Sequence, residues 1–477
     1  MLIDSLRKDI PFFPYVNTGT LYDFYTGKFQ AATNGLWVLN GGLSQCTGAM
    51  GRGQTYKSGI AGSMFSRALV IHPDAVGYVY ESEGTIPGAE RYDDFVPEAD
   101  AVSERIAFKN STICNLTDFY DDFNQLVDEK EKHRKDYIVE SPFFNHRTGK
   151  PYKIWVPTFV LVDSFSRARS NKGDMQFDAN SIDDSAMNTF WLQEGNIKTR
   201  IMNDLPGRAA RAGIYVIMTA HVGDKKDLDP YNKSPKQLQY MKNADKMKNV
   251  GSNFEFLTTT LLQTLKASVM QNPKDKTCLY PHKFSTDVEV NQVDTMMVRC
   301  KNNASGMMLP FIVSQYQGIL DDVTNFQFLR DNKDFGLDIR GNNQGFVPKI
   351  CGVDGKVLSR NNLRAMTEEE YSISRALQLL AELCFMQNMW TTWRMPEYVH
   401  TTPECLAERL KDSKKCSVER VLQSTGVWSS SKQKRERLTI LDILHFLDNE
   451  NKTPVIVDMG KNTASPEVKL VKIAQVA

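Results

Sequence analysis

The stretch Gly48-Ala49-Met50-Gly51-Arg52-Gly53-Gln54-Thr55-Tyr56-Lys57-Ser58-Gly59 carries the strongest fold signal in the chain. Phosphate-binding loops read Gly, four residues, then Gly-Lys-Ser or Gly-Lys-Thr. Gly51 and the pair Lys57-Ser58 keep this spacing, whereas Tyr56 stands where the second glycine belongs. A loop of this kind wraps backbone N–H groups around phosphates and leads into a helix N-terminus, where the helix dipole favours negative charge. We therefore predict a nucleotide-binding loop, with an ordinary glycine-rich turn as the alternative.

The residues of this loop have separate expected roles. Lys57 would reach the outer phosphates of ATP and support the reaction, and the Ser58 hydroxyl would take one position on Mg²⁺. The backbone of the rest of the loop would surround the phosphates. The expected ATP contacts are therefore Gly51, Arg52, Gly53, Gln54, Thr55, Tyr56, Lys57 and Ser58.

The composition limits the classes of function that the chain can serve. With 477 residues it is long enough for two or three domains. It carries 58 Lys and Arg residues against 57 Asp and Glu residues, so binding of nucleic acid must come from a local patch. No signal peptide or apolar run of membrane-spanning length stands out. The eight cysteines lack CxxC pairs, which suits reduced thiols. These features predict a cytoplasmic protein with no membrane partner.

Strand-like and helical stretches alternate between about residues 43 and 320, which predicts a parallel sheet with crossover helices. The clearest strand-like runs are continuously apolar, as strands buried on both faces are. They are Gly77–Glu81, Thr158–Asp163, Ile214–Thr219 and Thr295–Arg299. The charged stretch 119–137 is expected to form a solvated helix within an insertion.

This alternation stops near residue 345, and a mainly helical C-terminal region follows. Thr367 and Glu370 predict a capping box ahead of apolar residues at helical spacing. Thr402 and Pro403 predict the start of a second helix. We therefore expect an α/β protein in three parts, which are an N-terminal segment at 1–34 that could serve oligomerisation, a core at 35–345 and a C-terminal domain at 346–477.

Hydrolysis of ATP also needs a carboxylate near the metal and a base for the attacking water. Asp163 ends an apolar run, as the carboxylate of a Walker B strand does, and we predict that it binds Mg²⁺ together with Ser58. The alternative is an aspartate that caps the next helix. Glu83 follows another strand-like run, where a carboxylate could polarise the water. Glu81 is the alternative residue for that role.

His221 ends a third strand-like run and is expected to sense the γ-phosphate, or else to be an ordinary packed histidine. The segment 225–248 behind it holds seven lysines against three aspartates. Lysines neutralise DNA phosphates without reading sequence, and aromatic rings offer faces to unstacked bases. A solvated surface loop is the alternative. The predicted DNA contacts are Lys225, Lys226, Lys233, Lys236, Lys242, Lys246, Lys248 and Phe254.

A basic stretch, Arg299-Cys300-Lys301-Asn302-Asn303, ends the last strand of the predicted core. Its basic residues could lie on an edge that faces a neighbouring subunit and reach the ATP of that subunit.

Taken in order, these motifs resemble those of the RecA family, and in particular those of the strand-exchange recombinases of tailed phages, the UvsX type. An aromatic residue commonly replaces the second glycine of the loop in that group, as Tyr56 does here. Tyr80-Glu81-Ser82-Glu83 resembles the stretch whose final glutamate is the catalytic base, and Val162-Asp163-Ser164 resembles the end of the Walker B strand. His221 and the segment 225–256 fall where the family places its sensor and its DNA-binding loop.

The basic stretch 299–303, followed by Pro310-Phe311 and Gly318-Ile319, resembles a family stretch whose lysines act in trans on the nucleotide of the adjacent subunit. Asn303 replaces the second of those lysines, and the spacing to Pro310 is three residues longer. Only Lys301 therefore keeps the implied role. The resemblance spans about residues 35–330, and the C-terminal region lies outside it.

The resemblance implies a RecA-like P-loop ATPase core with a twisted, mostly parallel sheet, and a helical C-terminal domain. It implies a DNA-dependent ATPase in which Lys57, Glu83 and His221 act on ATP. The protein would form filaments on single-stranded DNA and pair it with homologous duplex DNA, in the cytoplasm of an infected bacterium if a phage encodes it. Two alternatives stay open. One is a hexameric, ring-shaped replicative helicase of the DnaB type, and the other is an ATP-binding structural or regulatory protein without a DNA role.

Overall fold

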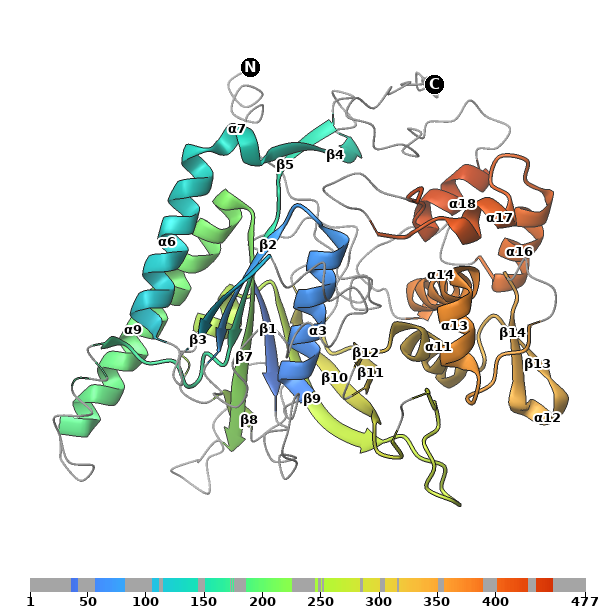
Figure 1. Ribbon diagram of the computed structural model, residues 1–477, viewed down its shortest axis with the longest axis horizontal. Helices are drawn as coiled ribbons and strands as arrows, with labels where there is room; N and C mark the ends of the chain where they lie inside the picture. The colour runs from blue at the N-terminus through green and yellow to red at the C-terminus, as the bar shows by residue number, and fades with distance from the viewer. Residues whose placement is uncertain are drawn as a thin grey trace.

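The structure is a computed structural model, and it describes the greater part of the chain (Figure 1). All structural statements below refer to the described residues. These are 36–41, 56–81, 105–110, 115–144, 151–171, 173, 175, 186–224, 245–247, 250, 253–283, 286–300, 305–314, 317–350, 356–388, 401–427 and 435–448.

A sheet of ten strands forms the centre of the described chain. Its strand order is β12-β11-β10-β9-β1-β7-β6-β2-β3, and the short strand β8 pairs with β7. Strands β9, β1, β7, β6, β2 and β3 run parallel, whereas β10, β11 and β12 are antiparallel to their neighbours. The parallel sheet and the mixed content agree with the predicted α/β class. The strands are β1 Leu36–Gly41, β2 Val76–Glu81, β3 Ile106–Asn110, β6 Thr158–Asp163, β7 Ile214–Asp224, β8 Asp245–Met247, β9 Thr260–Val269, β10 Val290–Cys300, β11 Met308–Ser314 and β12 Gly318–Ile319.

The four strand-like runs predicted from the sequence all form strands, namely β2, β6, β7 and β10. Every residue of β6 is buried, which confirms a strand covered on both faces. Three of the strands are longer than predicted, and β2 exceeds the prediction only by Val76. β7 continues to Asp224 because its end pairs with β8, and β10 spans Val290–Cys300 because β9 and β11 pair with it on its two sides.

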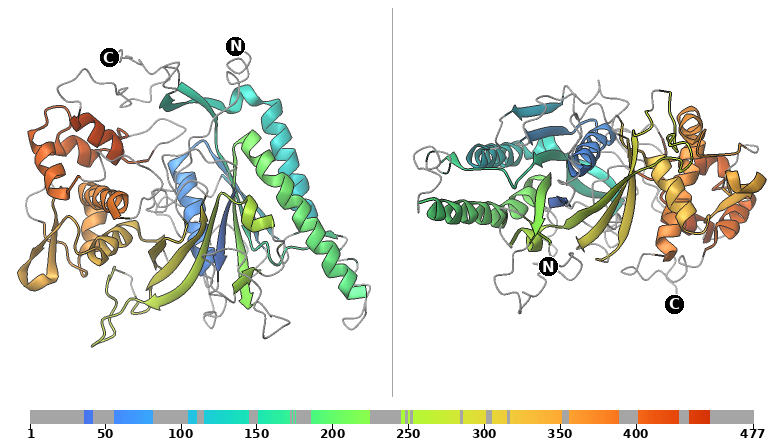
Figure 2. Two further views of the ribbon diagram at one scale, coloured as in Figure 1. Left: turned by 180° about the vertical axis from the view of Figure 1, so that it is seen from behind. Right: turned by 90° about the horizontal axis from the view of Figure 1, so that it is seen from below.

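Side chains of β6 alternate between two hydrophobic layers, one on each face of the sheet. Phe159 and Leu161 belong to the cluster that contains the buried side of α3, whereas Val160 and Val162 belong to the cluster that contains α6 and α9. The helices therefore cover opposite faces, and the core has three layers (Figure 2). The helices of this core are α3 Tyr56–Ile71, α6 Leu116–Lys132, α9 Ala186–Ala212 and α10 Asn253–Leu257.

An insertion between β3 and β6 differs in part from the prediction. The charged stretch 119–137 forms two helices, and the longer one, α6, is not solvated on all sides. Phe119, Phe123 and Val127 recur at helical spacing and are buried against the sheet. The Asn115 side chain accepts hydrogen bonds from two backbone N–H groups at the start of α6. The insertion also contains α7 Arg134–Tyr137 and the hairpin of β4 Ile138–Phe144 and β5 Pro151–Trp155.

The described C-terminal elements are mainly helices, which pack on the β11 side of the sheet through α11 (Figure 1). The expected domain boundary at 345/346 falls at the start of β14, whose partner β13 precedes that boundary. The hairpin therefore crosses it. The elements are α11 Asp321–Asp331, β13 Leu337–Arg340, α12 Gly341–Gln344, β14 Gly345–Pro348, α13 Leu363–Glu369, α14 Tyr371–Asn388, α16 Pro403–Asp412, α17 Val418–Gln423 and α18 Ile440–Asp448.

Of the two predicted helix starts in this region, one is confirmed. Thr402 is the N-cap of α16, with its side chain accepting from Cys405 N, and Pro403 is the first helical residue. The other prediction is wrong. Thr367 lies within α13, where its hydroxyl donates to Leu363 O, and Glu370 is the C-cap of that helix. The periodic residues that follow belong to a separate helix, α14.

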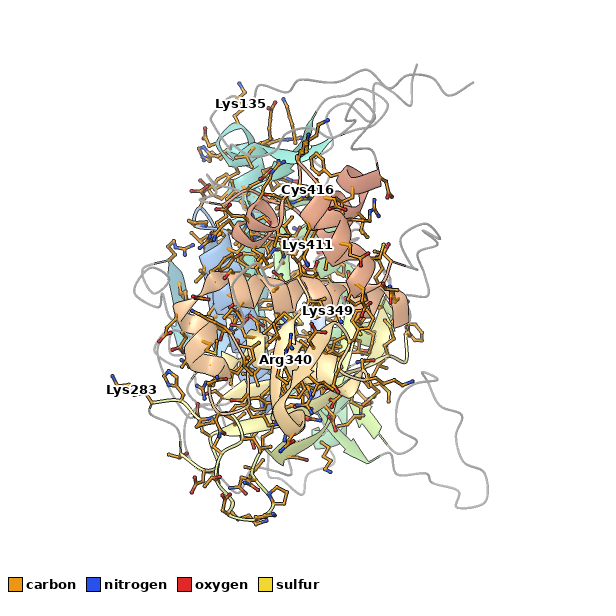
Figure 3. The ribbon with its side chains drawn as sticks, turned by 90° about the vertical axis from the view of Figure 1, so that its right-hand side faces the viewer. Lys135, Lys283, Arg340, Lys349, Lys411 and Cys416 are labelled. Carbon is orange, nitrogen blue, oxygen red and sulfur yellow. The ribbon has the colours of Figure 1, made fainter. Side chains whose placement is uncertain are left out.

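Two sets of polar contacts fasten the C-terminal elements to the core and to each other. The Ser63 hydroxyl of α3 accepts from Ile319 N at 3.1 Å, and Arg67 of α3 forms an ion pair with Asp321 at the start of α11. Lys349, labelled in Figure 3, lies within 2.7 Å of Asp338 and 3.2 Å of Glu404 and thereby joins the β13–β14 hairpin to α16. No helix in the described part of the chain is long and apolar enough to cross a membrane.

Lys130 of α6 is a buried amine at the junction of the insertion and the sheet. Its Nζ atom donates to Val156 O at 2.8 Å and to Thr158 Oγ1 at 2.9 Å. It also lies 5.6 Å from the ring centroid of Tyr137 and 5.8 Å from that of Trp155. These contacts favour the charged amine, but burial disfavours it and lowers the pKa of Lys130 to about 7.

This pKa predicts an unusual pH dependence of stability. Below about pH 7 Lys130 is charged in both states, so the full cost of burying the charge opposes folding. Between that pH and its ordinary pKa, the unfolded chain holds a proton that the folded chain has lost, and stability rises with pH. Lys130→Met removes the titrating amine and therefore lacks this pH dependence. Its stability relative to wild type should therefore fall as pH rises from about 7 to 9.5, by up to ~1.4 kcal/mol per pH unit.

Urea unfolding of both proteins across this pH range measures the difference. Lys132→Met, at an exposed position on the same helix, is the matched control and should show no such trend. A difference between Lys130→Met and wild type that stays constant with pH would contradict the assignment.

Candidate functional site

Four parallel strands end side by side at one edge of the sheet, in the order β1, β7, β6 and β2. The register places Gly41 of β1 beside His221 of β7, and Asp163 of β6 beside Glu81 of β2. In Figure 1, β1 and β7 point to the lower edge of the sheet. Ligands of open α/β sheets bind outside the carboxyl ends of the strands. The structure therefore brings together strand ends that the sequence analysis had assigned to separate roles.

Asp163 is fully buried at the end of β6. The hydroxyl of Thr219, on the neighbouring strand β7, donates to Asp163 Oδ1 at 2.6 Å. A buried carboxylate costs free energy unless hydrogen bonds or cations compensate its charge. The Thr219 hydrogen bond supplies part of this compensation and fixes the orientation of the carboxylate, as outer partners of metal ligands do.

A helix follows the predicted phosphate-binding loop, since α3 begins at Tyr56. Lys57 and Ser58 lie in its first turn, and α3 packs across β1, β7 and β6. The side chains of Tyr56, Lys57 and Ser58 lie outside the described part of the structure. The same holds for the whole of Gly51, Arg52, Gly53, Gln54 and Thr55.

The Asp163 carboxylate suits a Mg²⁺ ion in its chemistry. A carboxylate oxygen at the strand end suits Mg²⁺, which usually takes one or two carboxylates and completes its shell with phosphates and water. Within the described ranges no three His, Cys, Asp or Glu side chains gather into a metal cluster. Asp163 thus offers one carboxylate ligand for an ion whose other ligands would be phosphates and water.

Several other predicted site residues lie outside the described ranges, and they remain predictions. Among them are the proposed base, six of the loop lysines and the residue expected to act in trans. Lys246 lies in β8, but its side chain is not described. The residues outside are Glu83, Lys225, Lys226, Lys233, Lys236, Lys242, Lys248 and Lys301.

His221 is half-buried at the edge, and its backbone is fixed to the turn that follows Asp163. Its N–H donates to Ser166 Oγ at 2.9 Å. One residue earlier in that turn, Phe165 N donates to Thr219 O at 3.0 Å. The end of β7 and the turn after β6 therefore form one hydrogen-bonded unit around Asp163.

Phe254 is not placed to contact DNA, contrary to the prediction. It is fully buried in α10, and its ring stacks on Phe165 with centroids 5.7 Å apart and planes 19° apart. This placement offers no ring face to a base. The exposed aromatic residue of the same helix is Phe256, with 46% of its surface accessible, and Arg299 lies over its ring at 5.2 Å.

β10 ends, at Cys300, at the edge of the sheet opposite to Asp163, whereas the basic stretch beyond Cys300 lies outside the described residues. Cys300 pairs with Thr260 of β9, and Thr260 pairs with Trp37 near the start of β1. Gly41, at the other end of β1, pairs with Thr264. β10 therefore ends at the amino ends of the parallel strands, away from the edge that holds Asp163.

Three residues of this region were missed by the sequence analysis, namely Thr219, Phe165 and Ser166. Thr219 is two residues before His221 in the same strand, so strand periodicity could have placed both side chains on one side. Phe165 and Ser166 carry no motif, and only the fold shows that they lie between Asp163 and α10.

Comparison with known proteins adds no relative, since no protein family matches this sequence and no curated protein shows significant similarity to it.

The Thr219 hydroxyl gives a test of the predicted Mg²⁺ site at Asp163. Thr219→Val removes the donor to Asp163 while keeping the volume of the side chain. We expect the Mg²⁺ concentration that supports half-maximal nucleotide binding to rise roughly ten- to hundredfold, because partners of metal ligands have effects of this size. Thr219→Ser keeps the hydroxyl and should bind Mg²⁺ nearly as wild type does. Titration of Mg²⁺ against a fluorescent ATP analogue measures this, and equal Mg²⁺ dependence of all three proteins would refute the role.

Proposed function

We propose that this chain is a DNA-dependent ATPase with a RecA-like P-loop core. In this proposal it binds single-stranded DNA as a nucleoprotein filament and pairs that DNA with homologous duplex. The observation that carries the proposal is the shared edge of β1, β7, β6 and β2. There the strand before the glycine-rich loop ends beside His221, and Asp163 lies one strand further on.

The order of the strands supports distinct roles for the residues at this edge. The loop after β1 leads directly to α3, so phosphates bound by that loop would lie at the N-terminus of α3. Asp163 is separated from β1 by β7 alone, so its carboxylate would lie near phosphates bound by that loop and could share an ion with them. β2 ends at the same edge, and Glu83 is two residues further along the sequence.

The roles then follow from the chemistry of each side chain. When bound, ATP with Mg²⁺ supplies the γ-phosphoryl group whose transfer to water drives the cycle. Lys57 would neutralise charge on the outer phosphates, while Ser58 and Asp163 would hold the ion. Glu83 would orient the attacking water and accept its proton. His221 would contact the γ-phosphate and, through the chain that follows β7, relate nucleotide occupancy to the lysine-rich segment 225–248.

The position of Cys300 supports a repeating assembly. Subunits stacked head to tail would bring the amino edge of one sheet toward the carboxyl edge of the next. Cys300 lies at that amino edge, and Lys301 is the next residue in the sequence. In this proposal Lys301 would act on the nucleotide of a neighbouring subunit. A head-to-tail contact generates an open helix or a closed ring, depending on the rotation per subunit.

Substitution of the two candidate bases tests the assignment of the reaction. Glu83→Gln should lower kcat for ATP hydrolysis at least roughly a hundredfold, because general bases contribute effects of this size. Binding of ATP and of DNA should remain. Glu81→Gln, two residues earlier, is the matched control and should keep most of its activity. Lys57→Ala should lose nucleotide binding itself.

Steady-state hydrolysis and binding of a fluorescent ATP analogue separate these outcomes. If Glu81→Gln rather than Glu83→Gln abolished hydrolysis, the base would be Glu81. Unchanged hydrolysis in Lys57→Ala would refute the phosphate-binding loop.

A strand-exchange assay tests the proposed function as a whole. The protein is loaded on circular single-stranded DNA with ATP and then mixed with linear duplex DNA of the same or of unrelated sequence. We expect joint molecules with homologous duplex only. Unwinding of a forked duplex without any need for homology would instead support the ring-shaped helicase. Absence of both activities, together with hydrolysis that DNA does not stimulate, would overturn the DNA role.

A further inference from the structure

Helix α9 presents two buried charged side chains to the part of the chain that follows Asp163. Glu194 is 6% exposed and Lys198 is 4% exposed, and the two residues lie one helical turn apart. Charged side chains are rarely buried to this extent unless polar groups compensate their charge. The contacts of these two residues therefore show which parts of the chain the helix holds in place.

Glu194 holds the more distant part. Its carboxylate accepts a hydrogen bond from Ser170 N at 3.1 Å and another from the Ser170 hydroxyl. Ser170 Oγ accepts in turn from Gly173 N at 3.0 Å. These contacts fix the chain beyond the turn that follows Asp163, and they do not involve the strand ends.

Lys198 holds the turn itself. Its Nζ atom donates to Ser166 O at 3.3 Å and lies 5.6 Å from the ring centroid of Phe165, within the range of cation–π attraction. Ser166 is also buried, and its Oγ atom accepts from His221 N at 2.9 Å. Lys198 and His221 therefore contact the same residue, one through its carbonyl oxygen and the other through its hydroxyl.

The end of β7 depends on this turn for support on its β6 side. The regular pairing of β6 with β7 ends at Val162 and Met218, whereas β1 pairs with β7 as far as His221. Beyond Met218, the turn replaces the strand, because Phe165 N donates to Thr219 O and Ser166 Oγ accepts from His221 N. The Ser166 contact thus extends this support to His221 itself.

Lys198 reaches the turn from the face of the sheet opposite to α3. Phe165 belongs to the hydrophobic cluster that contains α9, as do Met218 and Ala220 of β7. Side chains alternate along a strand, so His221 points to the other face. Lys198 therefore supports the end of β7 from the α9 face and does not stand among the residues expected to contact ATP.

We propose that Lys198 is a positioning residue, which sets the place of His221 at the nucleotide edge by holding Ser166. The inference rests on the proposed function, in which His221 contacts the γ-phosphate. Residues of a binding site must be held within about 0.5 Å of their productive position by the groups around them. Without the Lys198 ammonium, the Ser166 carbonyl loses this donor, and the hydroxyl that holds His221 is less well fixed.

The preference for ATP over ADP tests this role without any turnover. In the presence of Mg²⁺, the ratio of the Kd for ADP to the Kd for a non-hydrolysable ATP analogue measures the contribution of the γ-phosphate. In Lys198→Met this ratio should fall toward one, by roughly five- to tenfold, which is the effect of one hydrogen bond. The Kd for ADP should stay near its wild-type value, because ADP lacks the group that His221 would contact.

Two further variants separate positioning from support of the fold. Ser166→Ala is a smaller change that removes the acceptor of His221 N, and it should lower the ratio as Lys198→Met does. Glu194→Gln is the matched control, since it removes a buried charge one turn away on the same helix. It should keep the wild-type ratio, whatever its melting temperature. An equal loss in Glu194→Gln and Lys198→Met, or a wild-type ratio in both Lys198→Met and Ser166→Ala, would overturn the inference.

A double substitution shows whether Lys198 acts through His221. If it does, Lys198→Met combined with His221→Ala should lower the ratio no further than His221→Ala alone. A further loss in the double variant would contradict the inference. Failure of the proposed function shows itself separately, because His221→Ala alone would then keep the wild-type ratio or wild type would show no preference for the ATP analogue.

Discussion

The parallel pairing of β1, β7, β6 and β2 is the constraint on which the rest of the candidate site depends. Hydrogen-bonded strands lie about 4.8 Å apart, so residues at neighbouring strand ends come within reach of one ion and its phosphates. The register matters as much as the order. Thr219 can donate to Asp163 because β7 pairs with β6 as it does. A slip of one residue would turn the Thr219 side chain to the other face of the sheet.

Part of this arrangement could be predicted from the sequence. Strands β2 and β6 are continuous apolar runs between polar ends, and a run of that kind indicates both a buried strand and the side chain that emerges from it. Asp163 after β6, and His221 after the similar run of β7, were chosen as candidates in this way, and their roles stay predictions. The order of the strands within the sheet could not be predicted from the sequence, because β7 lies between β1 and β6 although it follows both in the chain. The separation of strands along the chain does not indicate that a later strand lies between two earlier ones.

The wrong predictions for Phe254 and for α6 also have physical causes. An aromatic residue behind a lysine-rich segment looks like a partner for bases, but Phe254 is in the core because Phe165 offers a buried ring to stack on. The charged stretch of α6 looked solvated because its charges outnumber its apolar residues. Burial depends on where the apolar residues lie, and they line one stripe of that helix.

The helical C-terminal elements are not a loosely attached appendage. One hydrophobic cluster runs from α3 through the sheet to α14 and α18. The buried Arg364 guanidinium forms two contacts of 3.2 Å with the Glu289 carboxylate and so fastens α13 to the chain just before β10. Together with the Arg67–Asp321 ion pair, these contacts connect the C-terminal helices to the same helix, α3, whose first turn carries Lys57 and Ser58. A displacement of the C-terminal helices would therefore also displace α3.

Electron cryomicroscopy of the full chain on long single-stranded DNA, with Mg²⁺ and a non-hydrolysable ATP analogue, tests this account most directly. It predicts open helical filaments in which the nucleotide lies between the Asp163 edge of one subunit and the Cys300 edge of the next. Closed rings around the strand would contradict the recombinase and favour a helicase. A nucleotide bound away from Asp163, or DNA that stays bare, would contradict the assignment of the site itself.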